Sequence, residues 1–196
     1  ILVVPPDHPA KNVKEMVEWA KKNPDKANYA STSPAFTTAS ELLKLKSGMP
    51  GQMIPYKSSN EMILSVIQGQ TLFAISDGPP AIPQIKAGKV KALAVTDVVR
   101  SEEVPDVPSM KEAGFPDVNI KLFSGYFVSK GTPPEIVAKL EAGLRKAVTD
   151  PDVSSKLKGM AVTPGGQPGS EFSAMIDNDI KMISEVIKAA NLKFEN

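Results

Sequence analysis

Short apolar runs and amphipathic segments alternate along the first part of the chain. The apolar runs have the length and composition of buried strands and lie at residues 27–30, 52–56, 71–75 and 90–96. The amphipathic segments between them carry helix start and stop signals and lie at residues 12–23, 38–46, 58–68 and 79–85. Repeated strand and helix units in this order predict an α/β domain with a parallel-rich sheet flanked by helices.

Several predicted helices begin with a capping box, in which a polar side chain and an acidic residue three positions later satisfy free backbone N–H groups. The pairs with this spacing are Asn12 with Glu15, Thr38 with Glu41, Ser58 with Glu61, and Thr132 with Glu135. Each pair predicts the residue at which a helix starts.

The pattern changes after Arg100. A Pro-rich connection leads to a longer predicted strand over 120–130, in which Gly125 indicates a bend or a close approach of the backbone. Helices follow, with predicted ranges 132–148, 151–157 and 170–190. These helices have too few strands to close a second sheet, so we expect that part of this second region is missing upstream.

Composition and charge exclude several classes of protein. The 196 residues are 41% hydrophobic and 23% charged, which is ordinary for a soluble globular protein. The net charge of +1 and the lack of basic runs argue against a nucleic-acid partner. No apolar run approaches the roughly 20 residues of a membrane helix. The absence of cysteine excludes disulfides, thiolate metal sites and a cysteine nucleophile.

Catalytic and cofactor motifs are absent from the sequence. The only histidine, His8, lies among prolines and is predicted to be a loop residue instead of a catalytic base. There is no G-x-S-x-G, no HExxH and no phosphate-binding glycine loop, since PGGQPG at 164–169 fits neither nucleotide motif. We therefore expect no enzyme activity, no metal and no cofactor.

Polar loops follow three of the predicted strands, at residues 31–38, 56–59 and 76–78. The carboxyl ends of parallel strands meet at one edge of a sheet, where ligands bind in open α/β folds. A helix that begins there offers unpaired N–H groups and the positive end of its dipole, so it can bind a carboxylate without Arg or Lys. The loops therefore predict an anion site.

The polar side chains of these loops have two possible roles each. Thr38 is expected mainly to start a helix with Glu41. The other hydroxyl groups of the loop either contact a ligand or stabilise the turn. They belong to Ser31, Thr32, Ser33 and Thr37. Asp77 either caps the following helix or accepts a hydrogen bond from a ligand amine or a bound water.

Residues 52–108 carry a family resemblance. The segments QMIPYKSSNEMILSVIQGQ, IPQIKAGKVKALAVT and VPDVPS occur in the order and spacing found in the substrate-binding receptors of tripartite tricarboxylate transporters, also called Bug proteins. The stretch SGYFVSKGTPPEIVAKL is similar to another segment of that family. The resemblance extends over nearly the whole chain.

This resemblance implies a periplasmic two-lobed binding protein of the type II class, which closes on a small carboxylate and delivers it to membrane transporter subunits. One lobe would comprise residues 5–122, and residues 1–4 and 123–196 would be the C-terminal remnant of the other lobe. The ligand would contact Thr38, Asp77 and the other hydroxyl residues of the 31–38 loop, together with Phe36 and Ser124.

The sequence also departs from the family pattern. The 31–38 loop is shorter, lacks the usual glycines and has no histidine near Thr37. The first lobe is incomplete, so we expect weak ligand binding by this chain alone and association through exposed apolar surface, as a homodimer or by lobe exchange. Two alternatives remain open: the effector domain of a LysR-like regulator, and a hydrolase with Ser31 or Ser33 as nucleophile.

Overall fold

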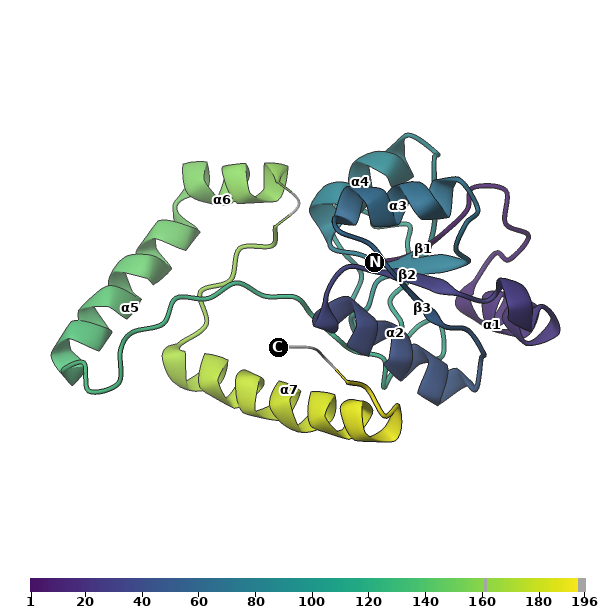
Figure 1. Ribbon diagram of the computed structural model, residues 1–196. Helices are drawn as coiled ribbons and strands as arrows, with labels where there is room; N and C mark the ends of the chain where they lie inside the picture. Colours follow the sequence, from purple (N-terminus) through teal and green to yellow (C-terminus); the bar gives the residue numbers. More distant parts are fainter. Residues whose placement is uncertain (161, 194–196) are drawn as a thin grey trace. The chain divides into compact units, whose positions relative to one another are not determined.

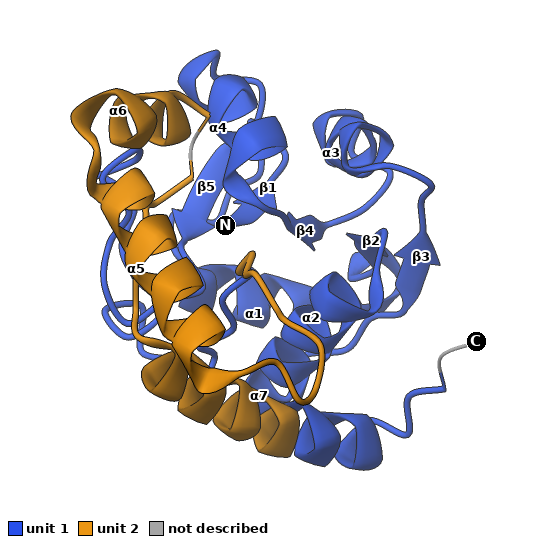
Figure 2. Ribbon diagram, turned by 90° about the vertical axis from the view of Figure 1, so that its left-hand side faces the viewer, with its two compact units in different colours: residues 1–122, 183–196 blue, residues 123–182 orange. Residues whose placement is uncertain are grey.

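The computed structural model describes residues 1–160 and 162–193. The chain divides into two compact units, each with its own internal contacts. The first unit comprises Ile1–Leu122 with Ile183–Asn196, and the second comprises Phe123–Met182 (Figure 2). Among the described helices, none is both long enough and apolar enough to cross a membrane.

A five-stranded sheet forms the centre of the first unit, in the order β3-β2-β4-β1-β5 (Figure 2). Its strands are β1 (Leu2–Val4), β2 (Tyr29–Ser31), β3 (Met53–Pro55), β4 (Phe73–Ile75) and β5 (Lys91–Ala94). β2 pairs in parallel with both β3 and β4, as the alternating pattern predicted.

β1 is the exception, because it lies between β4 and β5 and is antiparallel to both. The sequence prediction grouped residues 1–4 with the C-terminal region, whereas the structure places Leu2–Val4 inside this sheet. The physical reason is burial: all three side chains of β1 are fully buried, as expected for a central strand that is covered on both faces.

Four α-helices cover the two faces of this sheet. They are α1 (Val13–Lys22), α2 (Pro34–Ser47), α3 (Ser59–Ile67) and α4 (Gly78–Lys86), with a 3₁₀ turn at Pro24–Lys26 after α1. α3 and α4 lie on one face and α1 and α2 on the other (Figures 1 and 2).

Alternation along the strands sends neighbouring side chains to opposite faces. Ala30 and Ala74 belong to the core cluster that includes Met62 of α3 and Ala81 of α4. Their neighbour Tyr29 instead makes a hydrogen bond to α2 and stacks on Phe73.

Two of the predicted capping boxes in this unit are confirmed. Asn12 precedes α1, and its Oδ1 accepts a hydrogen bond from the Glu15 N–H at 2.9 Å. Ser58 precedes α3, and its Oγ accepts from the Glu61 N–H at 3.3 Å. Both side chains satisfy a backbone donor of the first helical turn.

The capping role predicted for Thr38 is wrong. α2 begins four residues earlier, at Pro34, with Ser33 as its N-cap. Proline is favoured at the first helical position because its φ is already helical and its missing N–H would have no partner there. Thr38 lies inside the helix, where its hydroxyl donates to the Pro34 carbonyl at 2.8 Å.

The second unit contains α5 (Pro134–Thr149), α6 (Pro151–Gly159) and the first part of α7 (Gly169–Ala189). The predicted Thr132 cap is wrong here too, because α5 has Pro133 as its N-cap and the Thr132 hydroxyl donates to the Ser129 carbonyl. The Asp150–Pro151 helix start is confirmed, since Asp150 Oδ1 accepts from the Asp152 N–H at 3.0 Å.

The strand predicted over 120–130 is wrong, because these residues are not assigned to any strand. The segment lacks backbone pairing with another strand, and apolar alternation cannot supply that pairing by itself. The close approach predicted at Gly125 is present: a Cβ added there would lie 2.3 Å from Cζ of Phe172. Phe123 and Phe127 also contact that ring, with centroids 5.3 and 5.6 Å away.

Candidate ligand site at the carboxyl edge of the sheet

The register of β2 and β4 brings two helix starts to the same edge of the sheet. Tyr29 pairs with Phe73 and Ala30 with Ala74, so the two parallel strands end side by side. α2 starts after the 31–33 segment and α4 after the 76–77 segment. The loops predicted to meet at the carboxyl ends of the strands therefore do so in the first unit.

Ser31 and Thr37 face each other at this edge. Their hydroxyl oxygens lie 2.9 Å apart, and the Ser31 hydroxyl is also 3.2 Å from the Ser33 carbonyl. Both side chains are buried. These bonds fix the turn that leads into α2, so the two hydroxyl groups serve the turn whether or not a ligand also reaches them.

The loop after β3 is tied to the same turn, because the Tyr56 N–H donates to the Ser31 carbonyl at 2.8 Å. Tyr56 is half-buried and packs against the core. Tyr56 was not among the site residues predicted from the sequence, although the position of its loop directly after a strand could have indicated it.

The first turn of α2 has no side-chain cap. Thr32 and Ser33 are half-buried, and the Ser33 hydroxyl makes no capping bond. The first N–H groups of a helix have no partner within the helix, so those of α2 lack a protein acceptor of the kind that Ser58 supplies to α3. This turn can accept an anion.

Asp77 does not cap α4, so this part of the two-way prediction is wrong. It occupies the N-cap position, but its carboxylate accepts no bond from the helix. An N-cap side chain bonds to the N–H of the second or third helical residue. In α4 these residues are Pro79 and Pro80, which have no N–H. Asp77 is half-buried, and its Oδ1 accepts from the Ser76 hydroxyl at 3.3 Å.

The side chains of two other predicted residues do not line this turn. Phe36 is buried in the core cluster with Met62 and Ile63, so its ring anchors the start of α2 to the core. Ser124 belongs to the second unit, where it is exposed.

A buried polar cluster holds α2 on the sheet. The Tyr29 hydroxyl donates to Oε1 of Glu41 at 2.7 Å, and Nζ of Lys44 lies 2.7 Å from the same oxygen. Nζ also lies 5.5 Å from the centre of the Tyr29 ring. Burial, and then the hydrogen bond to Glu41, raise the pKa of the Tyr29 hydroxyl, which therefore stays protonated and donates.

His8 lies in the loop after β1, as predicted. Because β1 runs antiparallel to β4, this loop leaves the edge opposite to that of Ser31 and Asp77. The His8 imidazole is buried against Trp19 and accepts from the Ala10 N–H at 3.2 Å. Burial and then the charge of Lys91 lower its pKa. It cannot act as a base for Ser31 or Ser33.

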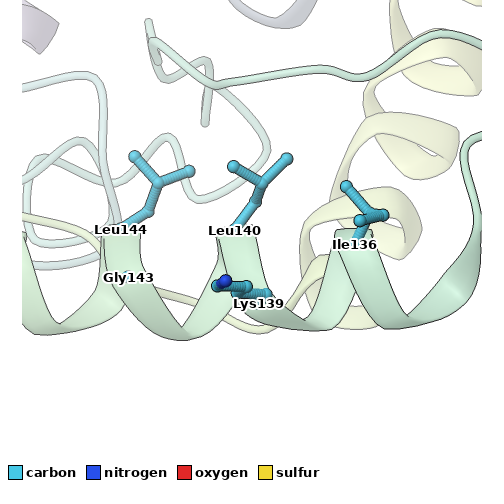
Figure 3. Close-up of a pocket in the computed structure, with 5 residues that line it drawn as sticks. All are labelled: Ile136, Lys139, Leu140, Gly143 and Leu144. Atoms are coloured by element: carbon cyan, nitrogen blue, oxygen red, sulfur yellow. The ribbon is translucent and has the colours of Figure 1, made fainter.

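A separate apolar groove runs along α5 in the second unit. It is lined by Ile136, Lys139, Leu140, Gly143 and Leu144. Ile136, Leu140 and Leu144 point the same way from the helix (Figure 3). The groove has no array of hydrogen-bond donors for a carboxylate. Within the described ranges, no group of three or more His, Cys, Asp or Glu side chains has a geometry suited to a metal ion.

Comparison with solved structures defines the class of the fold. The chain is similar to a structure described as a periplasmic transporter, with a TM-score of 0.82 and 32% identity over 100% of this chain and 66% of that one. It is also similar to Rpa4515 of R. palustris solved with adipate, with a TM-score of 0.78 and 25% identity over 97% of this chain and 64% of the other. The fold is that of a periplasmic solute-binding protein.

The family follows from the sequence. Residues 1–192 match the tripartite tricarboxylate transporter family receptor, TctC, and the chain belongs to this family. A protein from the tcbD-tcbE intergenic region of Pseudomonas sp. (strain P51) is 32% identical over 172 residues, which are 86% of this chain and 51% of that protein. The chain thus spans about half the length of this relative. The predicted resemblance is confirmed.

Family membership decides between the sequence-based alternatives. The family consists of periplasmic receptors and not of enzymes, so neither a LysR-like regulator nor a serine hydrolase is favoured.

Proposed function

We propose that this protein is the solute receptor of a tripartite tricarboxylate-type transporter. It works in the periplasm, captures a small carboxylate-containing ligand and passes it to the membrane subunits. The observation that carries this proposal is the uncapped first turn of α2, which lies beside the end of β4 in a chain of this receptor family. Backbone N–H groups and the helix dipole bind a carboxylate there without a cationic side chain.

The ligand class is supported by chemistry and by one relative. The start of α2 has no side-chain cap and residues 31–37 contain no Lys or Arg, so backbone N–H groups would bind the carboxylate there. Rpa4515, a structural relative, was solved with adipate, a dicarboxylate. We expect the ligand to contact the N–H groups of Ala35 and Phe36, with Thr32 and Ser33 at the rim.

Removal of one donor tests this site. Ala35→Pro deletes an N–H at the second helical position, where α4 already carries proline. We expect about a tenfold loss of affinity for the best of citrate, succinate, adipate and benzoate in isothermal titration, because a hydrogen bond to a charged group contributes about 1.5–3 kcal/mol. Asn60→Pro, at the same position of α3, is the matched control and should bind like the parent chain. If none of the four acids binds, the proposed function is wrong.

We further propose that the chain associates with a second copy, as a homodimer or by lobe exchange. A two-lobed receptor buries its ligand between lobes, and this chain spans only about half of the relatives it matches. Several large apolar side chains of the second unit are exposed, among them Phe127, Ile136 and Leu140. Exposed apolar surface of this kind favours association.

Solution scattering tests association directly. The mass is expected to rise from monomer to dimer with concentration, and Leu140→Glu should shift the transition to higher concentration because it places a charge on the apolar groove of α5. Lys146→Glu, an exposed position in the last turn of the same helix and outside the groove, changes charge without removing an apolar side chain and serves as the control. A monomer mass at all concentrations would contradict this proposal and leave the receptor function intact.

A further inference from the structure

We propose that residues 123–129 bind the same residues of a second copy of this chain as an antiparallel pair of strands, with Gly125 at the twofold axis. The inference rests on the association proposed above. It gives that association a surface with a defined register, in a segment separate from the groove along α5.

The backbone of this segment has free hydrogen-bonding groups. Residues 121–130 are all exposed, and residues 121–129 are assigned to no helix, strand or turn. Among the described residues, no backbone hydrogen bond involves residues 123–128. Figure 1 shows them in the open stretch that leads into α5. Unpaired N–H and C=O groups in a row are a template for pairing with another chain.

The side chains of the segment alternate between two faces, as they do in a strand. Phe123 and Phe127 contact the ring of Phe172, with ring centroids 5.3 and 5.6 Å away. A Cβ added at Gly125 would point at the same ring, 2.3 Å from its Cζ. The odd-numbered positions therefore share one face. The even-numbered positions point away from it, and Tyr126 is 82% exposed.

The sequence LFSGYFV at residues 122–128 reads almost the same in both directions around Gly125. An antiparallel pair centred on Gly125 therefore places Phe123 of one copy opposite Phe127 of the other. At the next position outward, an aliphatic side chain faces another, because residue 122 is leucine and residue 128 is valine. Aromatic and aliphatic side chains that face each other across two strands stabilise the pairing.

The alternation of faces limits the possible registers. Rotation about a twofold axis perpendicular to the two strands keeps each side chain on its own face, so an odd-numbered residue faces only odd-numbered residues. If Ser124 or Tyr126 lay on the axis, a phenylalanine would face Gly125. The register centred on Gly125 instead matches phenylalanine with phenylalanine. A glycine within a strand also permits the close approach of another backbone.

This symmetry makes a second copy the partner that fits the segment. In a twofold interface, each contact between residue i of one copy and residue j of the other is formed twice. The flanking charges agree with the same register. Lys121 would face Ser129, and Lys130 would face Ile120. Like charges therefore do not meet across the two strands.

Two double variants of the whole chain test the pairing and its register. Residue 124 of one copy faces residue 126 of the other, so Ser124→Glu with Tyr126→Lys places opposite charges against each other. Ser124→Lys with Tyr126→Lys is the matched variant and places like charges there. We expect its dimer dissociation constant in analytical ultracentrifugation to be at least about tenfold higher, because like charges opposite each other destabilise paired strands. Both positions are exposed, so both variants should fold, which circular dichroism checks.

Disulfide trapping gives a readout that does not depend on charge, because the chain contains no cysteine. Copies with Ser124→Cys and copies with Tyr126→Cys, one of them carrying a mass tag, are mixed and oxidised. Residues directly opposite each other have Cβ atoms about 4.5–5.5 Å apart, whereas residue 124 lies diagonally from its own counterpart at about 7–8 Å. We expect mainly the mixed dimer, well above the roughly one half that random pairing gives, because a disulfide requires close Cβ atoms.

The outcomes separate this inference from the other proposals. Equal dissociation constants for the two double variants, or a random distribution of disulfides, would overturn it. If the mass still rose with concentration in that case, association through the α5 groove would stand. A monomer at every concentration would overturn both the inference and the proposed association. The titrations with carboxylic acids test the receptor function independently of all these results.

Discussion

Gly51→Ala is expected to lower the free energy of unfolding of the first unit by about 3 kcal/mol, because a Cβ cannot be placed at this position. The ideal Cβ would lie 2.1 Å from the carbonyl oxygen of Ala27 and 2.8 Å from its carbonyl carbon. Both atoms are backbone and cannot rotate away. Gly51 also has a φ of +123°, which L-residues avoid.

The loss should be large because the backbone around Gly51 sets the register of the sheet edge. The next residue, Gln52, donates its N–H to Oδ1 of Asn28, and the Gln52 carbonyl accepts from the Tyr29 N–H. Displacing this segment therefore disturbs the pairing of β3 with β2. Urea denaturation followed by circular dichroism measures the change as a lower midpoint.

Gly48→Ala is the matched control. Gly48 also has a positive φ, of +66°, but nothing lies within 4 Å of its added Cβ. Only the conformational cost remains, and a loss of about 1 kcal/mol is expected. If the two variants lose the same stability, the close approach at Ala27 is not the cause.

Glu41→Ala is expected to cost about 3 kcal/mol of unfolding free energy, since removal of one partner from a buried ion pair leaves the other without compensation. The side chains of Glu41 and Lys44 are only 12% and 17% exposed. The variant also leaves the hydroxyl of fully buried Tyr29 without its acceptor. Chemical denaturation at neutral pH measures the loss.

Glu18→Ala supplies the comparison. Glu18 and Lys21 have the same i,i+3 spacing on a helix, but their side chains are 62% and 41% exposed. Exposed pairs contribute about 0–1 kcal/mol, so little change is expected. Tyr29→Phe removes only the hydroxyl and should cost about 1 kcal/mol. A small effect of Glu41→Ala would show that water replaces the bonds that Glu41 makes with Tyr29 and Lys44.

Periodicity was sufficient to predict most elements of the first unit, because burial of alternate residues acts over a few positions. The strands around Ala30, Ala74 and Leu93 and the helices between them lie where the apolar pattern predicted them. The direction and place of β1 could not be predicted, since three apolar residues carry no information about which neighbours they join.

The helix starts show a second limit of sequence reasoning. Thr38 and Glu41 have capping-box spacing, but Pro34 begins the helix earlier, and Glu41 bonds to Tyr29 across the fold. A side chain chooses between local and distant partners only once the chain is folded. Asp77 is different, because the two prolines that prevent its capping bond were visible in the sequence.

The central position of β1 also affects how this sheet is assembled. β4 and β5 each pair with β1, and among the described pairings they do not pair with each other. The sheet therefore stays in two parts until Leu2–Val4 joins Phe73–Ile75 on one side and Lys91–Ala94 on the other. Contacts so distant in sequence must overcome the entropy of closing a long loop, and they slow folding. Leu2–Val4 is thus expected to be among the last segments to take its place in the sheet.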